Sequence, residues 1–336
     1  MANEKKEIKL GKSVTTRVLV YVLCTLLIIY ASIILLSLFW GLITSLKNPY
    51  EFSSLQSLNK VGFPTLDKDN PLNSREEFFK LKNYVKIFQH LKYKRTEVFY
   101  RGQTEITHFA GGIEGTKVGL GGMLVRTLLY TVGGAAIQAF MPCMTAYLCA
   151  KYDEFKLSGI IFVVYLFMMC MPIVGNYPTE LTFLRNIGIY DTIWGNWIQK
   201  MTGSGMYYFV YFAYFKGVSN TYREAAEIDG APQIIIMFRI YFPLAIKMIS
   251  TVFLIQFVTL WNDYQTPLLY LPTFPTLAYA IFLMNSDNGS GEDMRELYGV
   301  TVRMAGCMLL AVPITLIFVV FKERLMGDVS LGGIKE

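Results

Sequence analysis

Long stretches without a charged residue alternate with short charged segments along this chain. Uncharged runs that predict membrane-spanning helices cover residues 18–46, 127–150, 157–179 and 304–321. A helix needs about 20 mostly apolar residues to cross the ~30 Å hydrocarbon core. Two weaker candidates are residues 201–215, which form a short run, and residues 248–271, which Asp263 interrupts. The pattern predicts an all-α, polytopic membrane protein with about six transmembrane helices.

The composition also favours a membrane protein. Hydrophobic residues make up 53% of the 336 positions and charged residues only 17%, whereas soluble domains have about 25% charged residues. The formal net charge is +6, and no basic stripe interleaved with aromatic residues occurs outside the loops. A nucleic-acid partner is therefore not expected.

The distribution of lysine and arginine predicts which side of the membrane each segment occupies. The tail at residues 1–17 carries five basic and two acidic residues, and such basic flanks stay in the cytoplasm. Residues 18–46 hold the first span and residues 123–322 the other five, so the tail at residues 323–336 is cytoplasmic too. Residues 47–122 form a long extracytoplasmic insertion, because loops beyond about 60 residues cross largely regardless of charge.

The insertion has a mixed character. Residues 74–91 place apolar side chains on one helical face and predict an amphipathic helix. The glycine-rich residues 104–122 predict turns and short strands. The insertion is either a partner-docking surface or a packed addition to the membrane domain. His90 and His108 are the only histidines, and without cysteines nearby they are expected to be surface residues, not metal ligands.

Catalytic signatures are missing from the sequence. Gly11, Lys12 and Ser13 match the end of a phosphate-binding loop, but Lys6 stands where that motif requires glycine. None of the five cysteines forms a C-x-x-C pair, and neither a Ser-His-Asp set nor an H-E-x-x-H motif is found. We expect no catalytic residue, no metal site and no cofactor bound by this chain.

Asp263 is the one strong candidate for an ionisable residue inside a span. If the fifth span starts near Leu244, Asp263 lies about 28 Å further along the helix, toward the outer surface. Two interpretations follow. The residue belongs either to a polar helix end that Trp261 and Tyr264 anchor at the interface, or to a substrate pathway formed by Trp261, Asn262 and Asp263.

A compact charged segment, NTYREAAEIDGAPQ at residues 220–233, lies between apolar stretches. Thr221 and Glu224 have the spacing of a capping box and predict the start of a short helix. Gly230 permits a sharp turn after that helix, and Pro232 suits the first turn of the next one.

The surrounding loop, residues 216–243, follows the fourth predicted span. Because the N-terminal tail is predicted to be cytoplasmic, four crossings place this loop in the cytoplasm as well. Its second part, QIIIMFRIYFPL, is strongly apolar and is expected to lie against the membrane until Pro243 turns the chain into the fifth span. Small alanines let another backbone come close to the charged helix, and acidic residues orient the contact. The segment is therefore expected to dock another protein.

The stretch EAAEIDGAPQIIIMFRIYFPL resembles the signature of permease subunits in bacterial ATP-binding-cassette importers of the binding-protein-dependent type. The spacing agrees: Glu-Ala-Ala, three residues, Gly230, nine residues, Ile240 and, three further on, Pro243. Phe242 stands where the family usually has leucine. Five other stretches are similar to the second permease of maltose-type carbohydrate importers: WGLITSLKNPYEF, NYVKIF, MPIVGNYPTELTFLRNIGIYDTIWG, WNDYQTPLL and the glycine-rich tail. The long outer loop departs from this branch.

The resemblance implies that residues 221–232 form the coupling segment, which sits in a cleft of a cytoplasmic ATPase. Glu224 would pair with basic groups of the ATPase, Ala225 and Ala226 would pack into the cleft, and Gly230 would provide the turn. The full set of implied docking residues is Arg223, Glu224, Ala225, Ala226, Ile228, Asp229, Gly230, Ala231 and Pro232.

The resemblance also implies partners and a location. The chain would form half of the translocation pathway for a sugar or oligosaccharide in the bacterial cytoplasmic membrane, surrounded by lipid. Its partners would be a second permease subunit, two cytoplasmic ATPase subunits that bind ATP and Mg, and an extracytoplasmic sugar-binding protein.

Two other classes remain open from the residues alone. A secondary carrier driven by an ion gradient would need inverted repeats and ionisable groups at mid-membrane, and only Asp263 qualifies. A membrane enzyme or assembly protein that uses the outer insertion would need convergent polar residues, and none is found.

Overall fold

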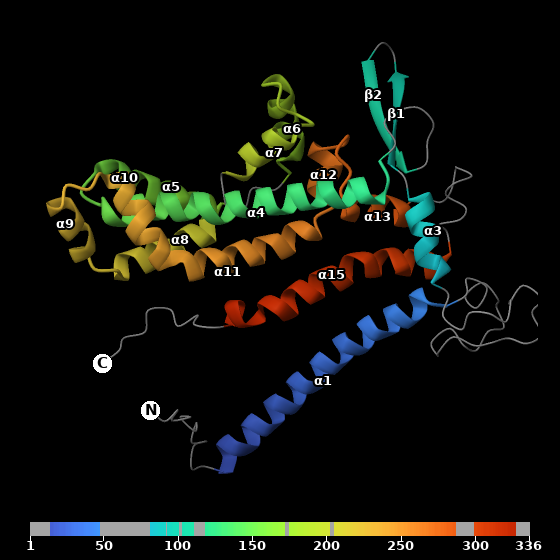
Figure 1. The fold of residues 1–336 in the computed structure, drawn as a ribbon, viewed down its shortest axis with the longest axis horizontal. Coiled ribbons are helices and arrows are strands. Elements are labelled where there is room, and N and C mark those ends of the chain that lie inside the picture. Colours follow the sequence, from blue (N-terminus) through green and yellow to red (C-terminus); the bar gives the residue numbers. More distant parts are fainter. Residues whose placement is uncertain are drawn as a thin grey trace, which may run out of the picture. The chain divides into compact units, whose positions relative to one another are not determined.

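The computed structural model describes residues 14–47, 81–91, 93–100, 103–110, 118–171, 175–201, 205–286 and 299–326. The chain divides into two compact units. One consists of residues 1–84 and 299–308, and the other of residues 85–298 and 309–336. Figure 1 shows helices throughout the described residues, apart from one hairpin, so the predicted helical membrane protein is confirmed.

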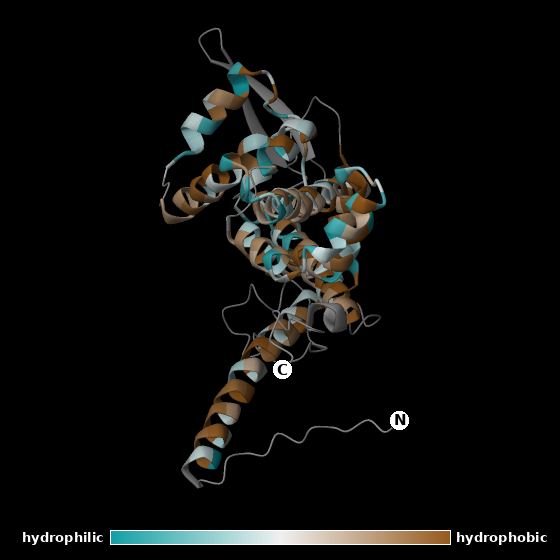
Figure 2. Ribbon diagram, turned by 90° about the vertical axis from the view of Figure 1, so that its left-hand side faces the viewer, coloured by the Kyte–Doolittle hydropathy of each residue, from teal (hydrophilic) through white to brown (hydrophobic). Residues whose placement is uncertain are grey.

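The first unit is dominated by the long helix α1 (Val14–Ser45). It is apolar along almost its whole length, as its brown ribbon in Figure 2 shows. Its end is held by polar contacts: Asn83 Nδ2 donates to the carbonyls of Ser45 and Lys47, each at 2.8 Å, and Ser45 Oγ lies 2.8 Å from Tyr84 Oη. α3 (Lys82–His90) begins at these contacts and covers the second half of the amphipathic helix predicted at residues 74–91.

The second unit is built around α4 (Leu120–Lys151), which packs along α11 (Phe242–Trp261) and α8 (Gly205–Gly217). The other helices are α5 (Lys156–Cys170), α6 (Tyr177–Asn186), α7 (Ile193–Lys200), α9 (Thr221–Ile228), α10 (Gln233–Ile236), α12 (Gln265–Tyr270), α13 (Leu277–Ser286) and, shared with the first unit, α15 (Val300–Met326). An aromatic core joins α4, α8 and α11, and Tyr147, Tyr211 and Phe215 are fully buried in it.

A hairpin precedes α4. β1 (Tyr93–Tyr100) pairs antiparallel with β2 (Gln103–Ala110), and Tyr93 lies opposite Ala110. The sequence predicted short strands between residues 104 and 122, so β2 overlaps that prediction and β1 was missed. Most of residues 111–122 lies outside the described residues.

Within the described residues, four helices are long and apolar enough to cross a membrane. They are Thr16–Ser45, Leu120–Lys151, Gln233–Trp261 and Val300–Phe321. Two predicted spans are shorter than expected: the run at residues 157–179 gives only the 15-residue α5, and the run at residues 201–215 gives the 13-residue α8. α5 ends because Met171 is extended (φ −83°, ψ 117°), a conformation that the following Pro172 favours. The count of six spans stays a prediction.

Pro243 does not turn the chain, contrary to the expectation from the sequence. α10, the π-helical turn η1 (Met237–Tyr241) and α11 form one continuous helical path of 29 residues. In η1 the N–H of Phe242 donates to the carbonyl of Met237, five residues back. The wider turn accommodates Pro243 in the first turn of α11, where no intrahelical donor is needed.

Candidate docking site

α9 begins without the predicted capping box. The N-cap residue is Asn220, and no side chain caps the first turn. Thr221 Oγ1 instead lies 2.7 Å from Ser219 Oγ, while Glu224 extends into solvent. The carbonyl of Asn220 accepts the backbone N–H groups of Arg223 and Glu224. The capping-box prediction is wrong because tertiary contacts recruit the Asn220 side chain, as described below.

α9 ends in a Schellman motif. The N–H of Ala231 donates to the carbonyl of Ala226 at 2.9 Å, and the N–H of Gly230 donates to that of Glu227 at 3.0 Å. Gly230 has φ +75°, which glycine adopts without the strain that a Cβ atom introduces. The predicted turn at Gly230 is therefore present, and Pro232 follows in an extended conformation as the N-cap of α10.

One face of α9 packs onto its own chain. Ala226 is buried in the aromatic core, with Ala231 beside it. The side chain of Arg223 is only 15% exposed; its Nη1 donates to the carbonyl of Lys151, and its guanidinium carbon lies 5.2 Å from the ring centre of Tyr152. Arg223 and Ala226 were both predicted to contact the ATPase, and the structure places both against α4 or the core.

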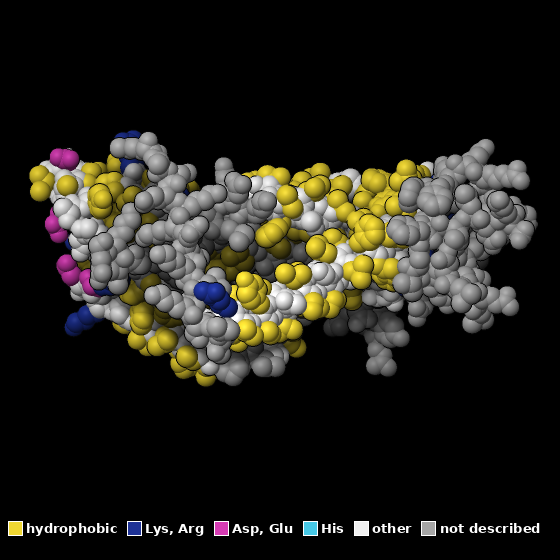
Figure 3. Space-filling model, turned by 90° about the horizontal axis from the view of Figure 1, so that it is seen from below, with side chains coloured by type: hydrophobic (Ala, Val, Ile, Leu, Met, Phe, Trp, Pro, Cys, Tyr) yellow, Lys and Arg dark blue, Asp and Glu magenta, His cyan; other side chains and the backbone are white. Residues whose placement is uncertain are grey.

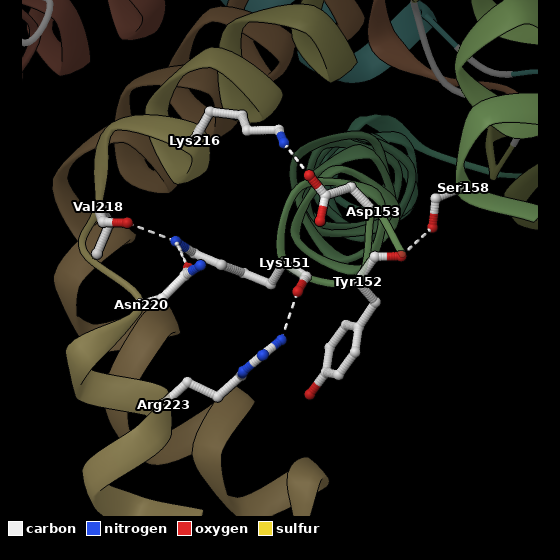
Figure 4. A network of polar contacts seen from close by, with 8 residues as sticks. All are labelled: Lys151, Tyr152, Asp153, Ser158, Lys216, Val218, Asn220 and Arg223. Carbon is white, nitrogen blue, oxygen red and sulfur yellow. Dashed lines mark hydrogen bonds and ion pairs between the residues drawn. The ribbon is translucent and has the colours of Figure 1, made fainter. Parts of the chain in front are cut away.

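Lys151 completes the attachment of α9 (Figure 4). Its ammonium group donates to the Val218 carbonyl and, at 2.9 Å, to Asn220 Oδ1. Close by, Lys216 at the end of α8 pairs with Asp153 after the end of α4. The Lys216 hydrogen bond, followed by its charge, lowers the pKa of the Asp153 carboxyl below its ordinary value. None of these contacts was predicted from the sequence, because each joins residues more than sixty positions apart.

Glu227 is also satisfied within the chain. Its Oε1 atom accepts from Gln233 Nε2 at 2.8 Å and lies 3.4 Å from Arg223 Nε. Tyr152 in turn donates its hydroxyl to Gln233 Oε1. These contacts tie α9 to α10 as well as to α4.

The opposite face of α9 points away from the chain. We call Tyr222, Glu224, Ala225, Ile228 and Asp229 the outward face. Ile228 is 87% and Tyr222 53% exposed. Within the described residues, neither the Glu224 nor the Asp229 carboxylate has a hydrogen-bond or ion-pair partner. Figure 3 shows acidic and hydrophobic side chains together at the end where α9 lies.

The expected pathway residues have partners within the chain. Trp261 is buried at the end of α11, and its Nε1 donates to the Leu310 carbonyl at 3.1 Å. Asp263 accepts the hydroxyl of Tyr130 on α4 at 2.7 Å and the N–H of Thr266 at 3.0 Å. Asn262 is exposed. Asp263 therefore lies just beyond the helix end and joins α4 to α12.

A polar network around Glu180 on α6 was missed from the sequence. Its Oε2 atom accepts from Gln199 on α7 at 3.0 Å and from the Tyr270 hydroxyl on α12, and its Oε1 atom accepts from Asn176. Asn176 and Glu180 are four residues apart, but Gln199 and Tyr270 lie 19 and 90 positions from Glu180, so no local motif joins the network.

An apolar cavity of about 530 Å³ lies between α4, α11 and the later part of α15. Ser250 is the one polar residue among the eleven that line it. A sugar site needs several convergent hydrogen-bonding groups, so this cavity does not suit a sugar. The described residues also contain no group of three or more His, Cys, Asp or Glu side chains that could hold a metal ion.

The family "Binding-protein-dependent transport system inner membrane component" matches residues 143–327, more than half of the chain. The chain belongs to this family. The match includes α9 with its Schellman turn, the π-helical turn and α11. The chain is thus a permease subunit of an ATP-driven importer, and the ion-driven carrier alternative finds no support.

Two relatives of this permease come from Bacillus subtilis (strain 168). The "Polygalacturonan/rhamnogalacturonan transport system permease protein YtcP" is 26% identical over 224 residues, which cover 63% of this chain and 76% of the relative. The "Arabinooligosaccharides transport system permease protein AraQ" is 26% identical over 214 residues, which cover 63% and 71%.

A solved structure has the same fold as this permease. It is described as "Crystal structure of a bacterial ABC transporter involved in the import of the acidic polysaccharide alginate". The TM-score is 0.67 at 18% sequence identity, and the match covers 93% of this permease and 98% of the other chain. At this identity the likeness concerns the fold alone.

Proposed function

We propose that this permease forms half of the pathway of a sugar or oligosaccharide importer and couples to a cytoplasmic ATPase through the outward face of α9. The observation that carries the coupling proposal is the contrast between the two faces of this helix. On the inner face, Arg223 and Glu227 make polar contacts within the chain and Ala226 is buried in its core. On the outward face, Glu224 and Asp229 are exposed and have no hydrogen-bond or ion-pair partner within the described residues.

The chemistry of the outward face indicates the kind of partner surface that it fits. Two carboxylates flank an exposed isoleucine, and Ala225 between them lets a partner backbone approach closely. A matching cleft would have basic groups at its rim and an apolar floor. Gly230, Ala231 and Pro232 would set the exit of the chain from this cleft.

ATP and Mg would bind the ATPase, and its closure would move α9. Such coupling requires that nucleotide binding favours one arrangement of the permeases over another. We further propose a second permease, two ATPase subunits and an extracytoplasmic binding protein as partners. In this arrangement both termini of the chain lie in the cytoplasm.

The proposed substrate class follows from the names of the relatives, which refer to transport of polygalacturonan and rhamnogalacturonan and of arabinooligosaccharides. For substrate contact we propose the region of Trp261, Asn262 and Asp263. Within it, Asn262 presents an exposed amide, while Trp261 and Asp263 hold the local structure through α15 and α4.

Isolation of the tagged chain from its native membrane tests the proposed complex. We expect mass spectrometry to find a second permease and an ATPase in the same complex. Recovery of the chain alone, fully active in sugar uptake after reconstitution, would contradict the proposal.

Site-directed cross-linking tests the docking face. In a cysteine-free background, Ile228→Cys should cross-link to the ATPase, because its side chain is almost fully exposed on the outward face. Glu154→Cys is the matched control, since Glu154 is exposed on the turn after α4 but lies off α9. Equal cross-linking of both variants, or of neither, would remove the support for this face.

A further inference from the structure

Lys151 is unusual among the charged residues of the second unit because it is almost fully buried. It lies at the end of α4 with 3% of its surface exposed. Within the described residues no carboxylate lies within ion-pair distance of its ammonium group. Burying a charge is strongly unfavourable unless hydrogen bonds compensate for it, so the contacts of this group indicate its role.

The ammonium group of Lys151 holds both sides of the corner between α8 and α9. The carbonyl of Val218 follows the end of α8, and Asn220 is the N-cap residue of α9. The ring centre of Tyr241 lies 5.3 Å from the same nitrogen. Charge-assisted hydrogen bonds are stronger and more directional than neutral ones, so they fix the angle of this corner.

Arg223 makes the reciprocal contact. Its guanidinium, which comes from α9, donates to the main-chain carbonyl of Lys151. That carbonyl belongs to the last turn of α4, where carbonyls have no intrahelical partner and attract cations. Lys151 thus binds the start of α9, and α9 binds the end of α4 through Arg223 (Figure 4). We call this pair of contacts the Lys151–Arg223 clasp.

We propose that Lys151 and Arg223 are positioning residues that join α9 and α4 into one rigid unit, so that displacement of α9 by the ATPase moves α4 and the packed α11 with it. This inference rests on the proposed docking function. Without the clasp, α9 would be held to its surroundings by the buried side chain of Ala226 and by the hydrogen bonds from Gln233 to Glu227 and from Tyr152 to Gln233. None of these contacts spans the corner at residues 218–220, which could then bend. Docking would then persist while its mechanical effect on the membrane helices would be lost.

The coupling ratio, sugar transported per ATP hydrolysed, tests the inference in the reconstituted complex. Lys151→Met keeps the side-chain length and removes the charge and the donors. We expect the complex to assemble and hydrolyse ATP, while the coupling ratio falls about tenfold, within the usual range for coupling between sites. Lys151→Arg should restore most of the ratio because it retains the charged donors.

Lys156→Met is the matched control. Lys156 is exposed at the start of α5, and removal of its charge should leave the coupling ratio unchanged.

A distance measurement keeps the proposal testable even if Lys151→Met weakens the complex. Spin labels at Leu148 on α4 and Thr221 at the start of α9, both exposed and both outside the outward face, can be introduced into the complete complex in a cysteine-free background. We expect one narrow distance distribution that does not change when ATP and Mg are added. A distance that shifts with nucleotide would show that α9 moves relative to α4, and would overturn the proposal.

The outcomes separate this inference from the proposed function. If the complex contains no ATPase, docking itself has failed. If the complex assembles and Lys151→Met retains a coupling ratio within about twofold of the unmodified chain, docking stands and the clasp is overturned, since a twofold change lies below the usual coupling range.

Discussion

Carboxylates in two regions of the second unit have opposite surroundings. Around α6, α7 and α12, Glu180 accepts three hydrogen bonds and Asp263 accepts two, all from the same chain. On the outward face of α9, Glu224 and Asp229 accept none from the described side chains. A carboxylate that its own chain satisfies holds helices together, whereas an exposed, unpaired one is available to a partner. The substitutions below test this distinction.

Glu224→Lys should have the largest effect on function. It places a cation where we expect a basic partner surface, so sugar uptake should fall at least tenfold. Membrane insertion and thermal stability should stay unchanged, because the side chain is exposed. Uptake by reconstituted complexes measures the first effect, and fluorescence-detected size exclusion measures the second.

The control for this substitution is Glu154→Lys, which makes the same charge change on an exposed residue outside α9. Normal uptake by Glu224→Lys in a complete complex would show that the docking assignment is wrong. Equal loss in both variants would indicate a general effect of charge and not a docking contact.

Glu180→Ala should have the largest effect on stability. It leaves the donors of Asn176, Gln199 and Tyr270 without their acceptor, which we expect to cost about 3 kcal/mol in the free energy of unfolding. The apparent melting temperature should fall by about 6–12 °C at the usual 2–4 °C per kcal/mol. Glu224→Ala, measured in parallel, should change it by less than about 2 °C, since surface substitutions stay within about 0.5 kcal/mol. Equal shifts would remove the distinction between the two regions.

Gly230→Ala should reduce stability less than Glu180→Ala does. Its main effect should be on the geometry of the proposed docking segment. The added Cβ atom is strained at φ +75° and costs about 1 kcal/mol. The Cβ would meet no other atom within 4 Å, so the cost is conformational and not steric. We expect a modest loss of stability with a reduced ATPase cross-link from Ile228→Cys. An unchanged cross-link would show that docking tolerates a different exit from α9.

The smallest effect is expected for the exposed Asp153–Lys216 pair. Lys216 lowers the pKa of Asp153 in the folded chain, so the pair stabilises the fold above the unfolded pKa of about 3.9. This stabilisation is lost as the pH falls through the lower folded pKa. Asp153→Asn should remove that part of the acid dependence of the melting temperature and change little near pH 7. A large loss at neutral pH would show that this surface pair matters more than exposed pairs usually do.

The charge-free runs in the sequence predicted α1, α4 and α15 well. They predicted α5 less well, although the uncharged run at residues 157–179 is longer than the run at residues 304–321 that gives α15. The absence of charge does not show where a helix ends. The extended residue before Pro172 ends α5, whereas the π-helical turn lets the helix continue past Pro243. Proline thus has opposite consequences at these two positions, depending on the turn that precedes it.

The sequence predicted the helix and the turn of the proposed docking segment, but it did not predict which side of the helix faces the rest of the chain. Glu-Ala-Ala and Gly230 identified a short helix and its turn, both of which the structure contains. Which residues face inward depended on Lys151, Tyr152 and Gln233, which lie outside the helix. Arg223 and Ala226 therefore fall on the inner face, although nothing in the local sequence separates them from Glu224 and Ala225.

The sequence alone determined that this protein has apolar helices of spanning length, one charged loop helix and the signature of an importer permease. Those properties depend on composition and on residues close together along the chain. The tertiary structure decided which charges are satisfied internally, which remain for a partner, and how α9 is joined to α4. These outcomes depend on hydrogen bonds between residues sixty or more positions apart, and only folding brings such groups together.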